Sequence, residues 1–143
     1  MLNINPYLNF DGTTEEAFNF YKSVFGGEFA LVMRWKDFPE PDKIPASQLD
    51  KIMHISLPIG KNAMLMATDA CESMGPSLTA GNNFNILVSS ESEEEADRLF
   101  NGLSAGGQQN MPMEKTFWGA YFGLLTDKFG IRWMVSYNYN QNN

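Results

Sequence analysis

The amino-acid sequence predicts an α+β protein in which two β-α-β-β-β modules form curved mixed sheets around a cleft. Three observations indicate this fold. Two amphipathic stretches each end in Gly-Gly, an alternating segment precedes each stretch, and three strand-like runs follow each one. The elements keep the same order in both halves, about 80 residues apart. Neither half has enough core to stand alone, so we expect the modules to close on each other.

The two helices are predicted within Thr14–Gly27 and Glu93–Gly107. Each stretch begins with acidic residues, which the helix dipole favours in a first turn. Thr13 or Thr14, and Ser92, are the candidate N-caps, and the glycines that follow are common helix ends. Apolar residues recur at the spacing of one helical face: Ala17, Phe20 or Phe18, Tyr21 and Val24, then Ala96, Leu99, Phe100 and Leu103.

Alternation with a period of two predicts the strands. In the first strand, Leu8 and Phe10 would face one side and Asn5, Tyr7 and Asn9 the other. In its counterpart, Phe84, Ile86 and Val88 would face the helix. The predicted strands span residues 5–10, 28–35, 52–58 and 63–68, then 83–88, 108–113, 120–126 and 131–137.

Length and composition bound the class of protein. The 143 residues suit one domain, with modules at about 1–70 and 82–138 and a linker at about 71–81. The formal charge of −7 argues against nucleic acid or an anionic membrane as the main partner. One cysteine and one histidine exclude a disulfide framework and a multi-histidine metal cluster. With no signal peptide or long apolar run, we expect a soluble, cytoplasmic protein.

Several motifs carry a resemblance to a known family. They are Asn5-Pro6-Tyr7-Leu8-Asn9-Phe10-Asp11-Gly12, Val24-Phe25-Gly26-Gly27, Met53-His54-Ile55, Phe117-Trp118-Gly119 and Asp127-Lys128-Phe129-Gly130. With them, nearly the whole chain resembles the vicinal oxygen chelate superfamily of glyoxalases, bleomycin-resistance proteins and dioxygenases. Within that superfamily the chain is most similar to the PhnB-like branch. The resemblance implies the paired-module fold and a homodimer, and says less about the chemistry because this fold hosts many activities.

The resemblance also implies where a divalent metal would bind. Enzymes of the superfamily use inward-facing residues of the first and fourth strands of each half, usually His, Glu or Gln. The matching positions here are Asn5 and Met64, then Asn83 and Met134. Neutral amides are weak ligands and thioethers prefer soft ions, so we predict no metal and no other cofactor.

His54, the single histidine, is the candidate catalytic residue. It shares a strand face with Ser56, and on a cleft face it could act as a general base or orient a ligand. The alternative interpretation is a hydrogen-bonded histidine with a structural role in the sheet.

Large apolar side chains are the other candidates for ligand contact. Phe117, Trp118 and Tyr121 lie around Gly119, which would allow close backbone approach at a cavity. Trp35, Met64 and Met134 could also line an adaptable apolar cavity. Packing in the core or in a dimer is the alternative for all of them.

The sequence therefore predicts a protein that binds a small apolar or amphipathic molecule without a metal. Asn5, Tyr7, Asn83 and His54 would orient the ligand. One alternative is a lyase or isomerase that uses His54 as base or holds metal at an unexpected site. Another follows a name given to relatives of this branch, 3-demethylubiquinone-9 3-methyltransferase. The sequence has no glycine-rich strand-to-helix turn for S-adenosylmethionine, which argues against that activity.

Overall fold

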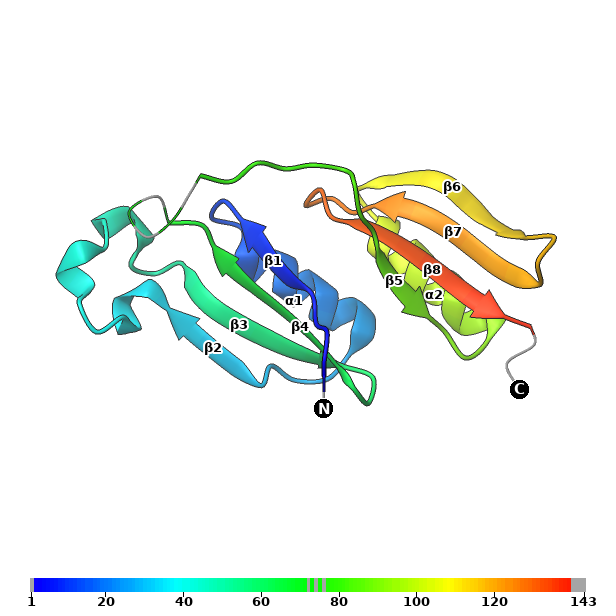
Figure 1. The fold of residues 1–143 in the computed structure, drawn as a ribbon, viewed down its shortest axis with the longest axis horizontal. Coiled ribbons are helices and arrows are strands. Elements are labelled where there is room, and N and C mark those ends of the chain that lie inside the picture. Colours follow the sequence, from blue (N-terminus) through cyan, green and yellow to red (C-terminus); the bar gives the residue numbers. More distant parts are fainter. Residues whose placement is uncertain (1, 72, 74, 76, 140–143) are drawn as a thin grey trace. The chain divides into compact units, whose positions relative to one another are not determined.

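The structure is a computed structural model that describes residues 2–71, 73, 75 and 77–139. The chain divides into two compact units, Met1–Thr79 and Ala80–Asn143. In its described residues, each unit has one α-helix packed on one face of a four-stranded mixed sheet (Figure 1). The α+β class and the repeated order of elements are therefore confirmed. That the two units make one domain around a cleft stays a prediction.

The first unit contains one long helix and four strands. The strand order in its sheet is β1-β4-β3-β2, with β1 parallel to β4 and the other neighbours antiparallel. Three short 3-10 helices, at Trp35–Asp37, Pro41–Lys43 and Ala46–Gln48, fill the connection between β2 and β3. The elements are β1 (Tyr7–Phe10), α1 (Thr14–Phe25), β2 (Leu31–Arg34), β3 (Ile52–Ile59) and β4 (Ala63–Asp69).

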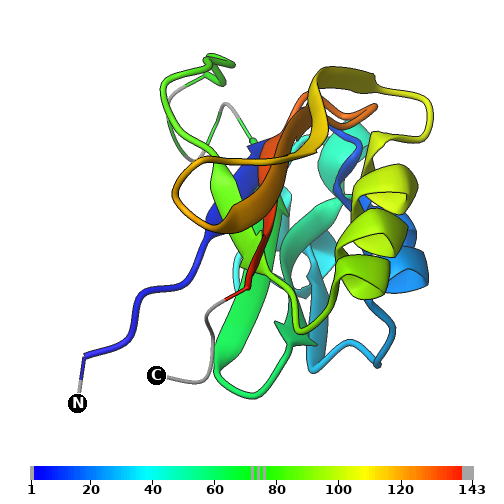
Figure 2. The ribbon, with the colours of Figure 1, turned by 90° about the vertical axis from the view of Figure 1, so that its right-hand side faces the viewer.

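The second unit repeats this topology. Its strand order is β5-β8-β7-β6, with β5 parallel to β8 and the remaining pairs antiparallel. Figure 2 shows α2 on one side of these strands. The elements are β5 (Ile86–Ser89), α2 (Glu93–Ser104), β6 (Gln108–Lys115), β7 (Ala120–Thr126) and β8 (Arg132–Asn138).

Each helix buries its apolar stripe against its own sheet, and this contact makes the core of the unit. The predicted stripe of α2 is confirmed in full. On α1, Phe18 rather than Phe20 is fully buried, beside Ala17 and Tyr21. The sheets contribute alternate residues to these cores, as the pleat requires: Leu8, Phe10, Ile55, Leu57, Leu65 and Ala67 in the first unit, and Leu125, Trp133 and Val135 in the second.

The two helix starts differ in how they are capped. The Ser92 side chain accepts the backbone N–H of Glu95 at 3.0 Å, as predicted. Thr13, one of the two predicted candidates, is the N-cap residue of α1, but its side chain makes no cap hydrogen bond. The Asp69 carboxylate instead accepts the backbone N–H of Thr14 at 3.0 Å, from the end of β4. A tertiary contact has replaced a local cap.

Strand boundaries shift by a few residues from the prediction. β1 and β5 begin later than expected, so Asn5 and Asn83 precede their strands. β2 ends at Arg34, and Trp35 opens the first 3-10 helix instead of closing the strand. Its indole Nε1 donates to the backbone oxygen of Asp69 at 3.2 Å, which ties this helix to the end of β4.

Candidate functional site

Each sheet has a face opposite its helix, which we call the first open face (β1–β4) and the second open face (β5–β8). Cross-strand register fixes which residues share the first one. Tyr7, Met66, Ser56 and Leu31 form one row across β1, β4, β3 and β2. His54 lies in the next row beside Met33 of β2. Alternation places Asn9 of β1 and Thr68 of β4, which are register partners, in that same row.

A hydrogen-bonded pair lies within this face. The Tyr7 hydroxyl oxygen is 3.0 Å from Nδ1 of His54, and their ring centroids are 5.6 Å apart. The Tyr7 side chain crosses β4 to make this contact, because β4 separates β1 from β3. Burial raises the pKa of the Tyr7 phenol, so this group is neutral at physiological pH. Tyr7 and His54, which we expect from the sequence to orient a ligand, therefore contact each other. Their contact with a ligand stays a prediction.

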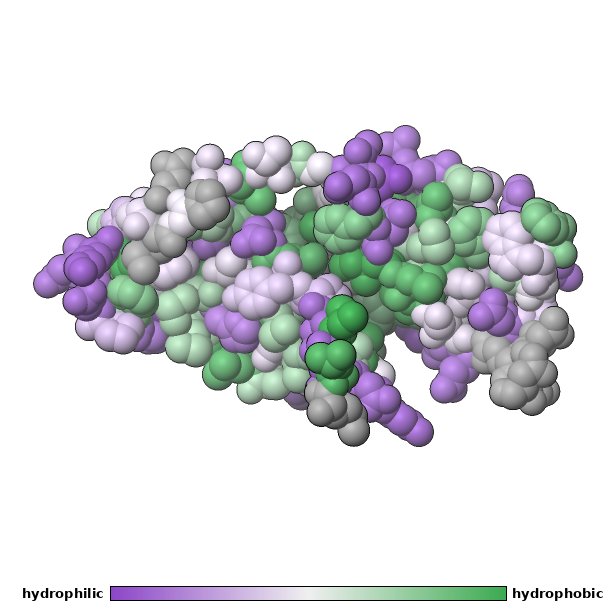
Figure 3. Space-filling view, in the orientation of Figure 1, coloured by the Kyte–Doolittle hydropathy of each residue, from purple (hydrophilic) through white to green (hydrophobic). Residues whose placement is uncertain are grey.

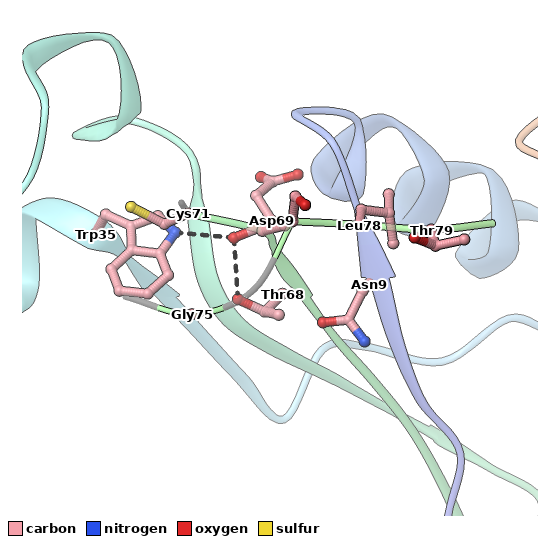
Figure 4. A pocket seen from close by; sticks show the side chains of 10 residues that line it. Asn9, Trp35, Thr68, Asp69, Cys71, Gly75, Leu78 and Thr79 are labelled. Atoms are coloured by element: carbon pink, nitrogen blue, oxygen red, sulfur yellow. Dashed lines mark hydrogen bonds between the residues drawn. The ribbon is translucent and has the colours of Figure 1, made fainter. Parts of the chain in front are cut away.

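The first unit contains a pocket of about 360 Å³ at the carboxyl end of β1 and β4. Asn9 and Thr68 of the first open face line it from the sheet. Trp35 lies on one side, and the segment 77–79 passes over the other (Figure 4). The volume lies at the small end of the range of ligand pockets. The full lining is Asn9, Trp35, Thr68, Asp69, Ala70, Cys71, Gly75, Ser77, Leu78 and Thr79.

The pocket offers neutral polar groups and no free charge from its described lining. Asp69 is the one ionisable carboxylate there, and its oxygens accept the backbone N–H groups of Thr14 and Ile52 at 3.0 and 2.8 Å. Its backbone oxygen accepts from Trp35 and from the Thr68 hydroxyl, as the dashed lines in Figure 4 show. The Asn9 amide and the hydroxyls of the lining therefore set the polarity.

A small apolar cluster holds the pocket wall in place. Trp35, Ile44 and Cys71 are buried together, and Phe38, Leu49 and Met53 pack against them. Most of the cluster comes from the connection between β2 and β3, which contains the 3-10 helices, while Met53 lies in β3 and Cys71 follows β4. Sequence reasoning identified Trp35 as a candidate but missed Asn9, Thr68, Gly75 and the segment 77–79. Alternation on β1 and β4 marks the first two, whereas no local pattern marks a wall made by an irregular segment.

The remaining candidates of the first unit lie near the amino end of β1. The Oδ1 atom of Asn5 accepts the backbone N–H of Met64 at 3.0 Å, which joins the segment before β1 to the start of β4. Met64 is opposite Pro58 of β3 on the first open face. Asn5 therefore has a structural bond in addition to its predicted contact with a ligand.

The candidates of the second unit do not form one group. Met134 lies on the second open face, between its register partners Leu87 and Leu124. Phe117 and Trp118 are exposed in the turn between β6 and β7, with rings 5.0 Å apart, and Trp118 contacts Phe122. Asn83 is exposed before β5.

Tyr121 lies on the opposite side of the second sheet from Met134. Its hydroxyl donates to the Asp97 carboxylate on α2 at 2.6 Å, so the side chain is on the helix-covered face. This hydrogen bond raises the pKa of Tyr121 to about 12. The structure therefore does not bring Tyr121 together with the other predicted ligand-binding residues.

The positions that match the superfamily's metal ligands do not fit a divalent ion. In the first unit they are an amide, whose oxygen already accepts a backbone N–H, and a thioether. In the second they are Asn83 and Met134, again an amide and a thioether. Among the residues that the structure describes, no three His, Cys, Asp or Glu side chains come together as a metal site. Hard and borderline cations prefer the carboxylates, imidazoles and thiolates that are missing here.

Charge is spread over the surface of both units and avoids the first open face. The Arg34–Glu15 pair links β2 to α1 through two hydrogen bonds of 2.7 and 3.1 Å. This bond holds the pKa of the Glu15 carboxyl below its usual value.

No helix in the described part of the chain is long and apolar enough to cross a membrane.

The fold and the sequence together define the class of protein. The fold is that of the glyoxalase/bleomycin-resistance proteins: a glyoxalase-related enzyme from Fulvimarina pelagi and a glyoxalase/bleomycin resistance protein from Albidiferax ferrireducens share it at 17% and 14% identity, each with a TM-score of 0.65. The family model described as 3-demethylubiquinone-9 3-methyltransferase matches residues 2–136. The chain therefore belongs to this family, the PhnB-like branch of the glyoxalase/bleomycin-resistance/dioxygenase superfamily, as the sequence motifs predicted.

Closer relatives match over nearly their whole length. The structure of protein PA1353 from Pseudomonas aeruginosa is 40% identical, with a TM-score of 0.85 over 96% of this chain and 98% of that one. The PhnB protein from Bacillus cereus, described as a putative 3-demethylubiquinone-9 3-methyltransferase, is 27% identical, with a TM-score of 0.74 over 95% and 99% of the two chains. Protein YjdN of Escherichia coli K12 is 27% identical over 93% of each chain.

Proposed function

We propose that this PhnB-like protein binds a small, uncharged, amphipathic molecule on the first open face, without a divalent metal. The observation that supports this most is the pocket of about 360 Å³, whose lining residues Asn9 and Thr68 lie in the same row of the sheet as His54. Tyr7 and His54 themselves are not among its lining residues. The one carboxylate of its described lining, Asp69, already accepts two backbone N–H groups, so a charged ligand would find no free counter-charge, and burying an unpaired charge is costly. Trp35 and Leu78 supply apolar contact, while Asn9 and Thr68 supply polar partners.

A fragment screen tests this proposal. Uncharged amphipathic fragments would be screened against the full-length protein by saturation-transfer NMR, and the hits titrated by calorimetry. We expect Asn9→Ala to weaken binding of the hits about tenfold, the effect of losing one good hydrogen bond. Asn19→Ala, an amide on the exposed side of α1, is the matched control. Hits whose affinity is the same in both variants, or a preference for charged fragments, would contradict the proposal.

The proposal has three further parts. The protein binds its ligand without a metal, it is a homodimer, and it is located in the cytoplasm. Amide and thioether donors at the matching positions argue against a metal. Native mass spectrometry of protein purified without chelator measures subunit number and bound metal together. We expect a dimer whose mass equals that of two chains with no metal bound. A stoichiometric excess equal to one divalent ion per chain would overturn the metal-free part, and a monomer would overturn the dimer.

An enzymatic function is the alternative, and the observation that favours it is the placement of His54 and Ser56 on one face of the sheet. His54 and Ser56 share the first open face, and Tyr7 holds the imidazole from the side. Such an arrangement resembles an acid–base site for a lyase or isomerase. If a substrate is found, His54→Ala should abolish its turnover, whereas retained turnover would exclude His54 as the base.

Methyl transfer, which the family description names, is less well supported by the turns of this chain. A nucleotide-type cofactor needs glycines where a strand turns into a helix. The turn between β1 and α1 contains one glycine, Gly12, and the turn between β5 and α2 contains none. Saturable binding of S-adenosylmethionine in calorimetry would restore this function.

A further inference from the structure

The imidazole of His54 has one hydrogen bond, through Nδ1. Its second ring nitrogen, Nε2, has no hydrogen-bond partner among the residues that the structure describes. The Tyr7 hydroxyl lies 3.0 Å from Nδ1. His54 is the single imidazole among 143 residues, so its protonation pattern can be measured without ambiguity.

The direction of the Tyr7–His54 bond follows from the chemistry of the two groups. A neutral phenol is a stronger donor than a neutral imidazole N–H, and an imidazole lone pair is a stronger acceptor than a phenol oxygen. Burial keeps the phenol protonated by raising the pKa of Tyr7. The hydroxyl proton also has one acceptor among the described side chains, the Nδ1 atom.

We propose that Tyr7 donates to Nδ1 of His54 and thereby fixes the neutral imidazole in the form that carries its proton on Nε2. His54 then presents an N–H donor, and not a basic lone pair, to a ligand on the first open face. Tyr7 is a positioning residue in this arrangement, because it acts through the imidazole.

The proposal names a chemical feature of the ligand and in this respect rests on the proposed function. A donor in this face requires an acceptor on the ligand, and the neutral surroundings favour a carbonyl oxygen over a carboxylate. Met33 and Met66 flank the polar pair through the register of β2 and β4. Apolar neighbours lower the local dielectric, which strengthens a hydrogen bond that is made and penalises one that is missing. A carbonyl compound should therefore bind in preference to an isosteric hydrocarbon.

The same arrangement bears on the enzymatic alternative. A general base on this face would need an unprotonated Nε2. Moving the ring proton to Nδ1 would reverse this hydrogen bond, so that Nδ1–H donates to the phenol oxygen and the hydroxyl proton turns away from the ring, which is the weaker pairing of donor and acceptor. The Tyr7–His54 contact thus favours ligand orientation over proton abstraction.

Long-range ¹H–¹⁵N NMR of the imidazole tests the proton position in the absence of any ligand. Spectra of ¹⁵N-labelled full-length protein are recorded at an alkaline pH at which the ring-nitrogen resonances no longer change with pH, so that the neutral imidazole is observed. We expect Nδ1 to resonate as an unprotonated nitrogen and Nε2 as a protonated one. In Tyr7→Phe, we expect both resonances to move towards the average of the two tautomers. Tyr137→Phe, in the second unit, is the matched control and should leave them unchanged.

A protonated Nδ1 in the wild type would overturn the proposal, and so would identical imidazole spectra in wild type and Tyr7→Phe. Two probes, acetophenone and ethylbenzene, then test the ligand feature. We expect acetophenone to shift the Nε2 resonance and ethylbenzene to leave it in place. Acetophenone bound at this face without any shift of Nε2 would overturn His54 as the donor. Failure of both probes to bind would count against the proposed function, and the tautomer result would stand.

Discussion

The two units share one topology and reach it with different side-chain contacts. In the second unit, α2 is capped locally: Ser92 accepts the Glu95 N–H, and the Glu95 carboxylate accepts the Glu91 N–H at 2.9 Å. In the first unit, α1 is capped from a distance by Asp69. The fold therefore does not depend on one capping solution.

The aspartate at the end of the sheet also differs between the units. Asp69 accepts from the first residues of α1 and β3, and so joins helix and sheet. Asp127 accepts from Phe129, Ile131 and the Trp133 indole, and so stabilises one turn and the following strand. Asp69 also lines the pocket, whereas Asp127 serves local structure. In the first unit, this structural carboxylate therefore also belongs to the lining of the pocket.

The open faces differ in chemistry as well. The first contains the polar group Tyr7, His54 and Ser56 among apolar neighbours. The second has no histidine, and Leu87, with 57% of its surface exposed, lies beside Met134. In Figure 3, hydrophobic residues gather over β5. On the strength of this contrast we propose specific recognition for the first unit and apolar contact for the second.

Removing the Asp69 carboxylate should have the largest effect on stability. Asp69→Ala would leave the buried N–H groups of Thr14 and Ile52 without acceptors. We expect a loss of about 3–5 kcal/mol in the free energy of unfolding, since two charge-assisted hydrogen bonds are lost. Urea unfolding gives the magnitude, and amide hydrogen exchange should show earlier exchange in α1 than in α2. An equal loss of protection in both helices would contradict the separate roles of the two aspartates.

The glycine pairs after the two helices should respond differently to alanine. A Cβ on Gly107 would lie 2.2 Å from the backbone oxygen of Thr126, so the backbone must move. A Cβ on Gly27 would have ordinary space, with only the strain of its positive φ of 84°. We expect Gly107→Ala to cost about 3 kcal/mol and Gly27→Ala about 1 kcal/mol, by thermal unfolding of both variants. A larger loss of stability in Gly27→Ala than in Gly107→Ala would contradict this, because it would mean that the backbone at Gly107 accommodates a Cβ easily.

The N-cap residues of the two helices should differ by a smaller amount. Ser92→Ala removes the acceptor for the Glu95 N–H and should cost about 1 kcal/mol. Thr13→Ala removes no cap bond and should change stability by less than about 0.5 kcal/mol. Urea midpoints of the two variants measure the difference. Equal losses would mean that Thr13 has a role in α1 that its contacts do not show.

The smallest effect concerns alkaline pH and the Tyr121–Asp97 hydrogen bond of the second unit. The hydrogen bond to Asp97 raises the pKa of Tyr121 to about 12, so the protonated phenol stabilises the folded state. That contribution is fully present below about pH 10, the pKa of an unfolded tyrosine, and is lost as the pH rises towards 12. Tyr121→Phe should therefore reduce the decrease of the urea midpoint at alkaline pH. In Tyr7→Phe, the contribution of Tyr121 to that decrease should be unchanged. An unchanged pH profile in Tyr121→Phe would contradict this role of the Asp97 bond.

Much of the fold follows from sequence patterns because those patterns are local. The helix stripes, the Ser92 cap and the alternation that sets Leu8 against Tyr7 depend on neighbouring residues. The Asp69 cap could not be predicted, because it joins residues 55 apart in the chain. Tyr121 was placed near a cavity because of its neighbours Trp118 and Gly119, whereas strand alternation turns it towards α2. The pocket could not be predicted, because Gly75 and the segment 77–79 that line it follow no periodic pattern in the sequence.

The most direct test of the account maps where a fragment binds. Amide chemical shifts of ¹⁵N-labelled full-length protein would be followed while the strongest uncharged hit is titrated to saturation. We predict that the saturable shifts gather at Tyr7, Asn9, His54 and Thr68, and that Asn9→Ala reduces them. Saturable shifts confined to the second unit, around Leu87 and Met134, would contradict the assignment of ligand binding to the first open face.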